Sequence, residues 1–314
     1  MRIGMPLDYS GGFTEAVAAL GDYEKAGLDI VSVPEAYSFD AVSQLGFLAA
    51  RTERIEIASG ILPIYTRTPT LTAMTAAGLD FLSGGRFTLG LGASGPQVIE
   101  GFHGVPYDAP LARTREVVEI CRAVWRREKV EYEGRHYTLP LPPERGTGLG
   151  KPLKIINRLV RERIPIVLAA IGPRNVELAA EIAEGWEPLF HHPEKAGEVW
   201  GRALAQGRAK RAPELGELDV VVGAPLAIGE DTDGLLDLMR PMYALYIGGK
   251  KKEAEAAVPG DLLRAAALVG SAGHVRERLA AYAQAGVTTL KVTPLAADHR
   301  SRVAAIEQLR EWAS

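Results

Sequence analysis

Short runs rich in β-branched residues alternate with amphipathic runs of helical period along the chain, and this alternation restricts the fold more than any single motif. Strands that alternate with helices pair in parallel, because a parallel pair needs a crossover that a helix usually provides. Eight strands and eight helices are predicted, which is what a (β/α)8 or TIM barrel needs. With 314 residues and 47% apolar content, the chain can bury one such core. We therefore predict an α/β fold with a single TIM-barrel domain over residues 1–314.

The expected elements follow one another closely. The strands are expected at residues 2–7, 29–33, 54–62, 86–92, 164–170, 185–190, 218–227 and 288–294. The helices are expected at residues 13–26, 41–51, 70–81, 111–127, 175–183, 194–206, 233–246 and 303–312. In the fourth helix Cys121 lies on the apolar stripe, so it is predicted to fill the core and not to act as a nucleophile.

Residues 128–163 interrupt this alternation of strands and helices, between the fourth helix and the fifth strand. The stretch VEYEGRHYTL alternates around Glu133-Gly134, which predicts a small hairpin, and PLPPERGTGLGKP follows it. Long loops inside compact domains are usually functional or mobile, so we predict a lid-like insertion over the barrel mouth. A passive decoration is the alternative.

Charge and cysteine content exclude several classes of protein. The net charge is -3 with 24% charged residues, so neither a nucleic acid nor an anionic membrane is an expected partner, and a small molecule is. A single cysteine excludes an intrachain disulfide and any multi-cysteine metal site. No apolar run reaches the length of a signal peptide core or a membrane span, so a soluble, cytoplasmic protein is expected.

The segment Gly90-Leu91-Gly92-Ala93-Ser94-Gly95 satisfies the pattern G-x-G-x-x-G. A dinucleotide-binding turn of this kind follows the first strand of its unit, opens into a helix and has an acidic residue about 20 positions later at a strand end. Here the pattern follows the fourth strand, and Pro96 delays any long helix until about residue 111. We interpret it as a glycine-lined strand end whose missing side chains would let a flat ligand approach.

Glu35 follows the second strand and is predicted to point toward the barrel mouth. A carboxylate there could hydrogen-bond a ligand or transfer a proton, so Glu35 is the candidate catalytic residue. A glutamate at a helix entry, or in a salt bridge, is the alternative.

A phosphate site is predicted where the fifth strand ends and the next helix begins. Free backbone N–H groups at a helix start, a glycine turn and a positive side chain suit an anion. The candidate residues are Ala170, Gly172, Pro173, Arg174 and Asn175. Late loops often complete such sites, so one of the adjacent His191 and His192 is expected to face it, and His191 is the candidate. No metal site is expected from two neighbouring histidines alone.

Several stretches together resemble a known family. SGGRFTLGLGASGPQVIEGFHGVPYDAPLARTREVVEICRAVW resembles the bacterial-luciferase-like superfamily, in particular its coenzyme F420-dependent oxidoreductase branch. In the right order, VPEAYSFDAVSQLGFLAARTERIEIASGI, IPIVLAAIGPRNVELAAEIAEGW and MYALYIGG also resemble that family. The similarity runs over nearly all of the chain.

The resemblance implies a TIM barrel that binds F420 or, in sister branches, FMN. Hydride would move to or from C5 of the deazaflavin or N5 of the flavin. The family places a bulge, often with a non-prolyl cis peptide, at the end of the third strand against the ring, so Gly60-Ile61 is the candidate pair, with an ordinary buried strand as the alternative. Ser94 and Gly95 would offer a hydroxyl and a backbone N–H to the pyrimidine edge.

The predicted protein is a homodimeric F420-dependent oxidoreductase acting on an organic small molecule. One alternative is an FMN-dependent monooxygenase supplied with reduced flavin by a separate reductase. Another is a non-catalytic cofactor-binding barrel, for which the support is a segment after Gly249 that is shorter and more charged than in the family. A barrel aldolase or isomerase would need a reactive lysine at a strand end, and Lys291 lies within the eighth strand.

Overall fold

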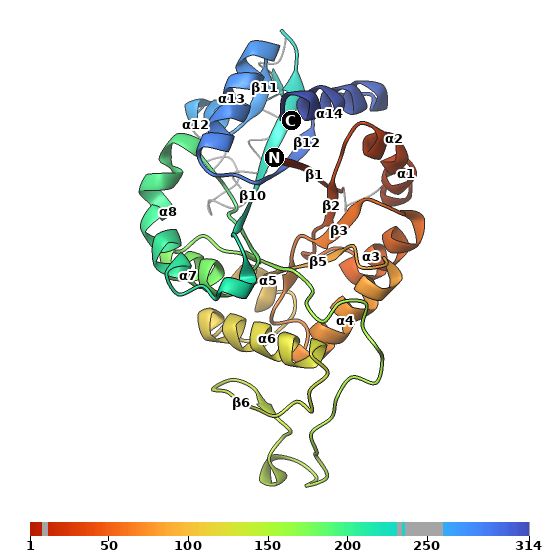
Figure 1. The fold of residues 1–314 in the computed structure, drawn as a ribbon, viewed down its shortest axis with the longest axis vertical. Helices are drawn as coiled ribbons and strands as arrows, with labels where there is room; N and C mark the ends of the chain where they lie inside the picture. Colours follow the sequence, from red (N-terminus) through yellow and green to blue (C-terminus); the bar gives the residue numbers. More distant parts are fainter. Residues whose placement is uncertain (8–11, 231–233, 236–259, 314) are drawn as a thin grey trace.

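Parallel strands close into a barrel in the computed structural model, which describes residues 1–7, 12–230, 234–235 and 260–313 (Figure 1). Within those residues eight strands form the closed ring, and each pairs in parallel with the next. In ring order they are β1 (Arg2–Pro6), β2 (Ile30–Val33), β3 (Glu56–Ser59), β5 (Phe87–Gly92), β8 (Ile166–Ala169), β9 (Gly185–Glu187), β10 (Asp219–Ile228) and β12 (Thr289–Pro294). Two short strands extend the ring, β4 (Leu62–Pro63) beside β5 and β11 (Leu268–Gly270) beside β10.

The strands are apolar because both of their faces are covered. All four residues of β2 and all six residues of β5 are buried. Parallel strands between a packed barrel interior and a helical layer have no solvent face, so they read as continuous apolar runs instead of alternating ones. This explains why apolar runs, more than period-two patterns, marked the strands in the sequence.

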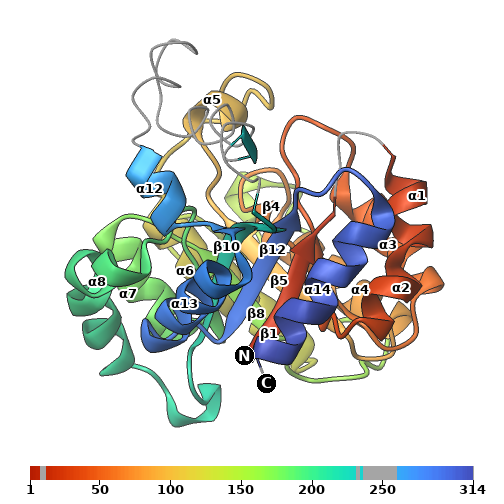
Figure 2. The ribbon, with the colours of Figure 1, turned by 90° about the horizontal axis from the view of Figure 1, so that it is seen from above.

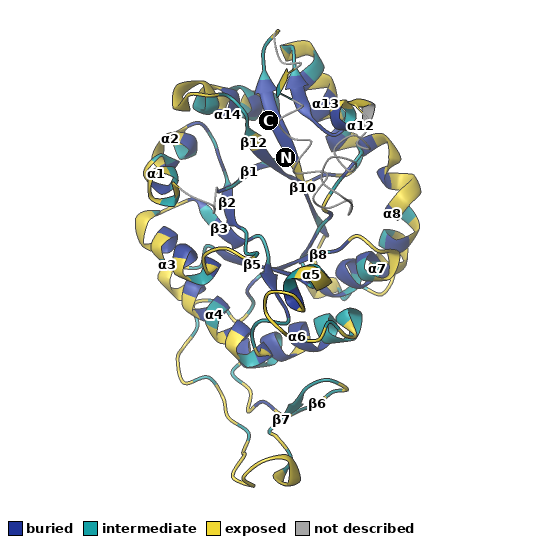
Figure 3. Ribbon diagram, turned by 180° about the vertical axis from the view of Figure 1, so that it is seen from behind, coloured by how far each residue is buried: buried dark blue, intermediate teal, exposed yellow. Residues whose placement is uncertain are grey.

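Helices surround the ring and bury one face each (Figure 3). They are α1 (Phe13–Ala18), α2 (Leu20–Lys25), α3 (Ala41–Arg51), α4 (Pro69–Leu82), α5 (Pro96–Ile99), α6 (Pro110–Trp125), α7 (Pro173–Ile182), α8 (Pro193–Arg208), α12 (Gly260–Ala265), α13 (Ala272–Gln284) and α14 (His299–Ala313). Side-chain caps begin some of them. The Asp40 carboxylate accepts a hydrogen bond from the Ser43 amide at 2.8 Å at the start of α3.

The predicted TIM barrel is confirmed, with differences in detail. The predicted helix 13–26 is two helices that meet at Ala19, and the predicted strand 54–62 is β3 followed by β4. No element is predicted for residues 260–284, but they contain α12, β11 and α13. Most of the predicted helix 233–246 and the charged segment after Gly249 lie outside the described residues.

The insertion 128–163 lies against the outer surface of the helical layer and does not cover the mouth, so its predicted placement as a lid is wrong (Figures 1 and 3). Its predicted hairpin is present as β6 (Tyr132–Glu133) and β7 (Thr138–Leu139). The Glu116 carboxylate on α6 accepts hydrogen bonds from the backbone amides of Arg135 and Tyr137 at 3.0 and 2.9 Å. These contacts hold the hairpin to the outer side of α6.

The single cysteine belongs to the core, as predicted. Cys121 is 0% exposed, and burial raises the pKa of its thiol to about 12. Its neighbour on α6, Trp125, is also fully buried and donates its indole N–H to the Ala73 carbonyl at 3.0 Å. Helix α6 is thereby packed on α4. In the described part of the chain no helix combines the length and the apolar character that crossing a bilayer requires.

Candidate functional site

The carboxyl ends of the strands form the barrel mouth, at the end where Figure 2 shows β4 and α5 and opposite the chain termini. Strand β3 ends there with a cis peptide bond between Gly60 and Ile61, as predicted. The Gly60 amide donates to the Val33 carbonyl of β2 at 2.8 Å, so the bulge remains attached to the neighbouring strand. Whether this peptide contacts a cofactor ring stays a prediction.

The glycines of the G-x-G-x-x-G pattern make room for β3. A Cβ atom on Gly90 would lie 2.0 Å from the Ser59 carbonyl oxygen, and one on Gly92 would lie 3.1 Å from the Ile61 side chain. The Ser59 hydroxyl donates to the Gly90 carbonyl at 2.9 Å and accepts from the Gly90 amide at 2.8 Å. At Gly90 and Gly92 the interpretation that the glycines leave space for a flat ligand is therefore wrong, because the chain itself occupies that space. As expected, only the short α5 follows, and α6 begins at Pro110.

Ser94 and Gly95 follow β5 at the mouth and are partly exposed. Ser94 has the left-handed φ of 60°, and its carbonyl accepts a hydrogen bond from the Tyr107 hydroxyl at 3.3 Å. Gly95 is the N-cap of α5. Within the described residues the Ser94 hydroxyl makes no hydrogen bond, and its contact with a pyrimidine edge remains a prediction.

The start of α7 has the features expected of an anion site. Residues 171–174 are exposed, and Gly172, the N-cap of α7, supplies no side-chain hydrogen bond to the first turn. A Cβ atom on Gly172 would meet nothing within 4 Å. Ala170 differs from the others, since it is buried and its carbonyl accepts the Trp186 indole N–H at 2.9 Å. Pro173 has no N–H, and the Asn175 amide donates to the Gly172 carbonyl at 3.0 Å, so the Arg174 amide, the exposed Arg174 side chain and the open space beside Gly172 are the features that can accommodate a phosphate.

These segments are neighbours because their strands are neighbours. Strand β5 lies between β3 and β8 in the ring, so their carboxyl ends line one arc of the mouth. A Cβ atom on Gly92 would be 3.1 Å from Ile61 Cδ1 and 3.3 Å from Ala169 Cβ, which places the ends of all three strands in contact distance. The arc therefore brings together the cis peptide, the Ser94 turn and the start of α7.

Glu35 follows β2 as predicted, but its carboxylate is occupied. Both oxygens accept hydrogen bonds from the Arg67 guanidinium, at 2.6 and 2.9 Å, and one also accepts from the Ala41 amide at the start of α3. The Glu35 and Arg67 side chains are only 8% and 13% exposed. This geometry supports the alternative of a salt-bridging glutamate at a helix entry.

Replacing Glu35 with glutamine is expected to lower the free energy of unfolding by about 3 kcal/mol, because it removes the charge from a buried ion pair. Chemical denaturation followed by circular dichroism measures this. Asp40→Asn is the matched control, because Asp40 also binds Arg67, at 2.7 Å, but its side chain is 49% exposed and asparagine still caps α3. Equal, small losses in the two variants would contradict the structural role of Glu35.

His191 is enclosed by the helical layer. It is 3% exposed, and its ring lies 5.8 Å from the ring centroids of Trp200 on α8 and Tyr282 on α13. Burial, with a smaller contribution from His192, lowers the pKa of His191 to about 4, so the ring is neutral at neutral pH. The prediction that His191 faces an open phosphate site does not fit this position.

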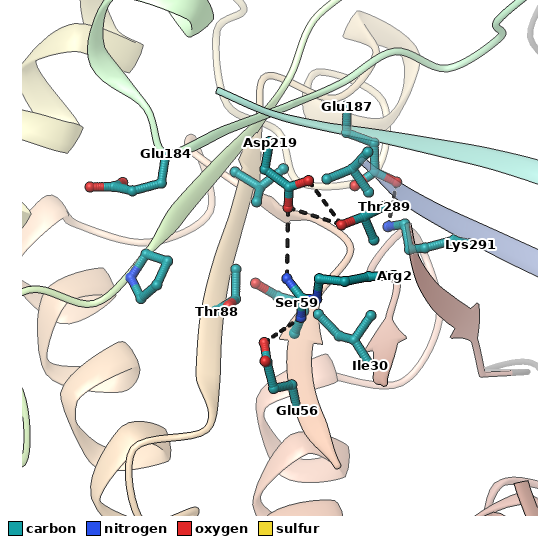
Figure 4. A pocket seen from close by; sticks show the side chains of 14 residues that line it. Arg2, Ile30, Glu56, Ser59, Thr88, Glu184, Glu187, Asp219, Thr289 and Lys291 are labelled. Carbon is teal, nitrogen blue, oxygen red and sulfur yellow. Dashed lines mark hydrogen bonds and ion pairs between the residues drawn. The ribbon is translucent and has the colours of Figure 1, made fainter. Parts of the chain in front are cut away.

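A buried ion pair crosses the barrel interior below the mouth. Lys291 on β12 points inward, is 7% exposed and pairs with Glu187 on β9 (Figure 4). A paired ammonium is not the free amine that a Schiff base needs, which disfavours the aldolase alternative. Sequence analysis noted Lys291 but missed Glu187, since nothing in their spacing indicates that they meet.

The pair lines a cavity of about 100 Å³ that reaches toward the amino end of the barrel. At that end the Arg2 guanidinium binds Glu56 at 2.5 Å and lies 3.8 Å from Asp219 (Figure 4). The Thr289 hydroxyl donates to Asp219 at 2.8 Å. Paired charges thus fill the amino end of the barrel, and the open arc is at the mouth.

A family model described as luciferase-like monooxygenase matches residues 1–289, which includes every strand of the barrel wall except most of β12. The chain belongs to the luciferase-like monooxygenase family. This confirms the resemblance found in the sequence.

Within the luciferase-like family, a protein of Mycobacterium tuberculosis named as a coenzyme F420-dependent oxidoreductase is 38% identical over an alignment of 347 residues. That alignment covers 98% of this chain and 99% of the relative. The two chains therefore correspond over nearly their whole lengths.

Solved structures share the luciferase-like barrel. The coenzyme F420-dependent tetrahydromethanopterin reductase of Methanopyrus kandleri matches with a TM-score of 0.81 and 22% identity, covering 99% of this chain and 97% of that one. The oxygenating constituent of 3,6-diketocamphane monooxygenase of Pseudomonas putida, solved with FMN, matches with a TM-score of 0.72 and 17% identity, covering 100% and 97%. At these identities the likeness concerns the fold alone.

Proposed function

We propose that this chain is an F420-dependent oxidoreductase that moves a hydride between C5 of the deazaflavin and an organic small molecule. The observation that carries the proposal is the full-length relationship, at 38% identity, to a protein named as F420-dependent. The arc at the mouth supports it, because it joins an open, uncapped helix start to the cis peptide and the Ser94 turn.

In this proposal the bound cofactor supplies the hydride chemistry, and the chain supplies position and electrostatics. Gly60 and Ile61 would support the ring from the end of β3. Ser94, in its left-handed turn, would offer its hydroxyl to the polar edge of the ring. The first turn of α7, with Arg174, would hold the phosphate of the cofactor tail.

Titrations of the purified protein with oxidised F420 and with FMN, at matched ionic strength and read by ligand fluorescence, test the choice of cofactor. Tight binding of F420 and weak binding of FMN is the expected result. The reverse would favour the alternative function of an FMN-dependent monooxygenase, and the structural likeness to an FMN-bound monooxygenase is the observation behind that alternative. Binding of neither ligand would contradict both proposals.

Gly172→Val is expected to weaken F420 binding about tenfold, which corresponds to about 1.4 kcal/mol, without unfolding the chain. The added methyl groups would extend into the open space beside the first turn of α7, where no protein atom lies within 4 Å. Gly197→Val on the exposed surface of α8 makes the same chemical change, also into open space, and should leave affinity unchanged. If both variants bind F420 like the parent protein, the phosphate is not held at α7.

A further inference from the structure

Two exposed aromatic side chains meet at the barrel mouth. Tyr37, in the loop after β2, is 59% exposed, and Phe102, which follows α5, is 65% exposed. Their ring centroids are 6.3 Å apart with an interplanar angle of 54°. Strand β3 lies between β2 and β5 in the ring, so this aromatic pair spans the end of β3, where the Gly60-Ile61 peptide lies.

Both loops that carry the pair are fixed to the body of the protein. Glu35 and Asp40, on either side of Tyr37, bind the same Arg67 guanidinium at 2.6 and 2.7 Å. Phe102 continues the turn of α5, since its amide donates to the Val98 carbonyl at 3.0 Å. The aromatic pair is therefore exposed although its backbone is held in place. Rigid loops that present apolar surface at a barrel mouth are typical of ligand contacts.

The positive charge of Arg67, in the loop region beside the aromatic pair, is neutralised by carboxylates of the protein. The Arg67 side chain is 13% exposed, and both of its terminal nitrogens are bound by carboxylates. Apolar side chains continue along the mouth, because Ile171 after β8 is 56% exposed and Leu189 after β9 is 37% exposed. Among the described residues, this part of the rim therefore offers ring faces and aliphatic groups, and the exposed Arg174 lies at the start of α7, where the cofactor phosphate is proposed to bind.

We propose that Tyr37 and Phe102 bind the non-reacting part of the substrate, and that the substrate is a neutral molecule with an aromatic or otherwise apolar body. This inference rests on the proposed function, because it places the substrate over the end of β3 beside the cofactor. Glu35 and Arg67 act as positioning residues for the loop that carries Tyr37.

Isothermal titration calorimetry with 2-naphthol, a small neutral aromatic probe, tests the inference on the full chain with and without F420. Phe102→Ala and Tyr37→Ala should each weaken 2-naphthol binding about fivefold or more. Phe81→Ala on the outer surface of α4 is the matched control, because Phe81 is 64% exposed and lies away from the mouth, and it should change nothing. Thermal unfolding and F420 affinity should stay at their parent values in all three variants.

Three outcomes would overturn the inference. One is equal 2-naphthol affinity in all variants, and another is tighter binding of glucose 6-phosphate than of 2-naphthol. A third is a change of oligomeric state in Phe102→Ala with no change in probe affinity, which would make the pair an interface between proteins. Failure of F420 to bind would contradict the proposed function, whereas 2-naphthol binding to the cofactor-free protein still reports on the aromatic pair.

Discussion

Gly90→Ala is expected to lower the free energy of unfolding by more than about 4 kcal/mol, a large part of the stability of an ordinary domain. The new methyl carbon would lie 2.0 Å from the Ser59 carbonyl oxygen and 3.0 Å from its carbon. Both are backbone atoms, so no side-chain rotation relieves the overlap, and β3 and β5 would have to separate. Denaturant titration followed by circular dichroism, together with the yield of soluble protein, measures the loss.

Gly46→Ala provides the matched control for this prediction. Gly46 lies within α3, and a Cβ atom there would meet nothing within 4 Å. Alanine is the better helix former, so this variant should be as stable as the parent or slightly more so. If Gly90→Ala does not fold, Ser59→Ala tests the same contact more gently, since it removes two buried hydrogen bonds and should cost about 2 kcal/mol. Parent-like stability of Gly90→Ala and of Ser59→Ala would contradict the close packing of β3 against β5.

Lys291→Met is expected to cost about 3 to 5 kcal/mol of stability, because it leaves the Glu187 carboxylate inside the barrel without its partner. Removing both charges of the pair has a different expected effect from removing one. Taking two charges out of water is costly, and replacing both by apolar groups of similar size is often neutral or stabilising. The double variant Lys291→Met with Glu187→Leu should therefore recover most of the stability that the single variant loses.

Unfolding of the parent, both single variants and the double variant forms a complete double-mutant cycle. Recovery in the double variant is the decisive observation. If the double variant loses as much as the two single variants added together, the two side chains act independently and the ion pair contributes nothing. F420 titration of the double variant tests whether the pair also serves the proposed cofactor arc, because a Cβ atom on Gly60 would lie 3.7 Å from Lys291 Nζ.

The barrel could be predicted from the sequence because its strands are buried on both faces and its helices on one. Helix α3 was predicted with the bounds that the structure has, since Asp40 marks its start and Thr52 follows its end. Helix α13 was missed although it carries a recognisable start. Ser271 caps it, and Val275, Leu279 and Tyr282 follow at helical spacing on its buried face. That signal was available in the sequence.

The candidate site was predictable only in part. The segments at strand ends were located correctly, because the carboxyl ends of parallel strands meet at one face of a barrel. Side-chain partners were not, since they depend on contacts between elements distant in sequence. The Glu35 contacts with Arg67, the enclosure of His191 by α8 and α13, and the anchoring of the insertion by Glu116 all arise from such contacts.

The insertion also makes this protein convenient for site-specific labelling. Cys121 is the single cysteine of the chain, and its burial and raised pKa leave its thiol unreactive. Thr147 is exposed, and it belongs to the insertion, which extends outside the helical layer and away from the mouth (Figure 1). A Thr147→Cys substitution would thus provide one accessible thiol, and a fluorophore attached there could report tumbling or surface immobilisation without touching the ligands.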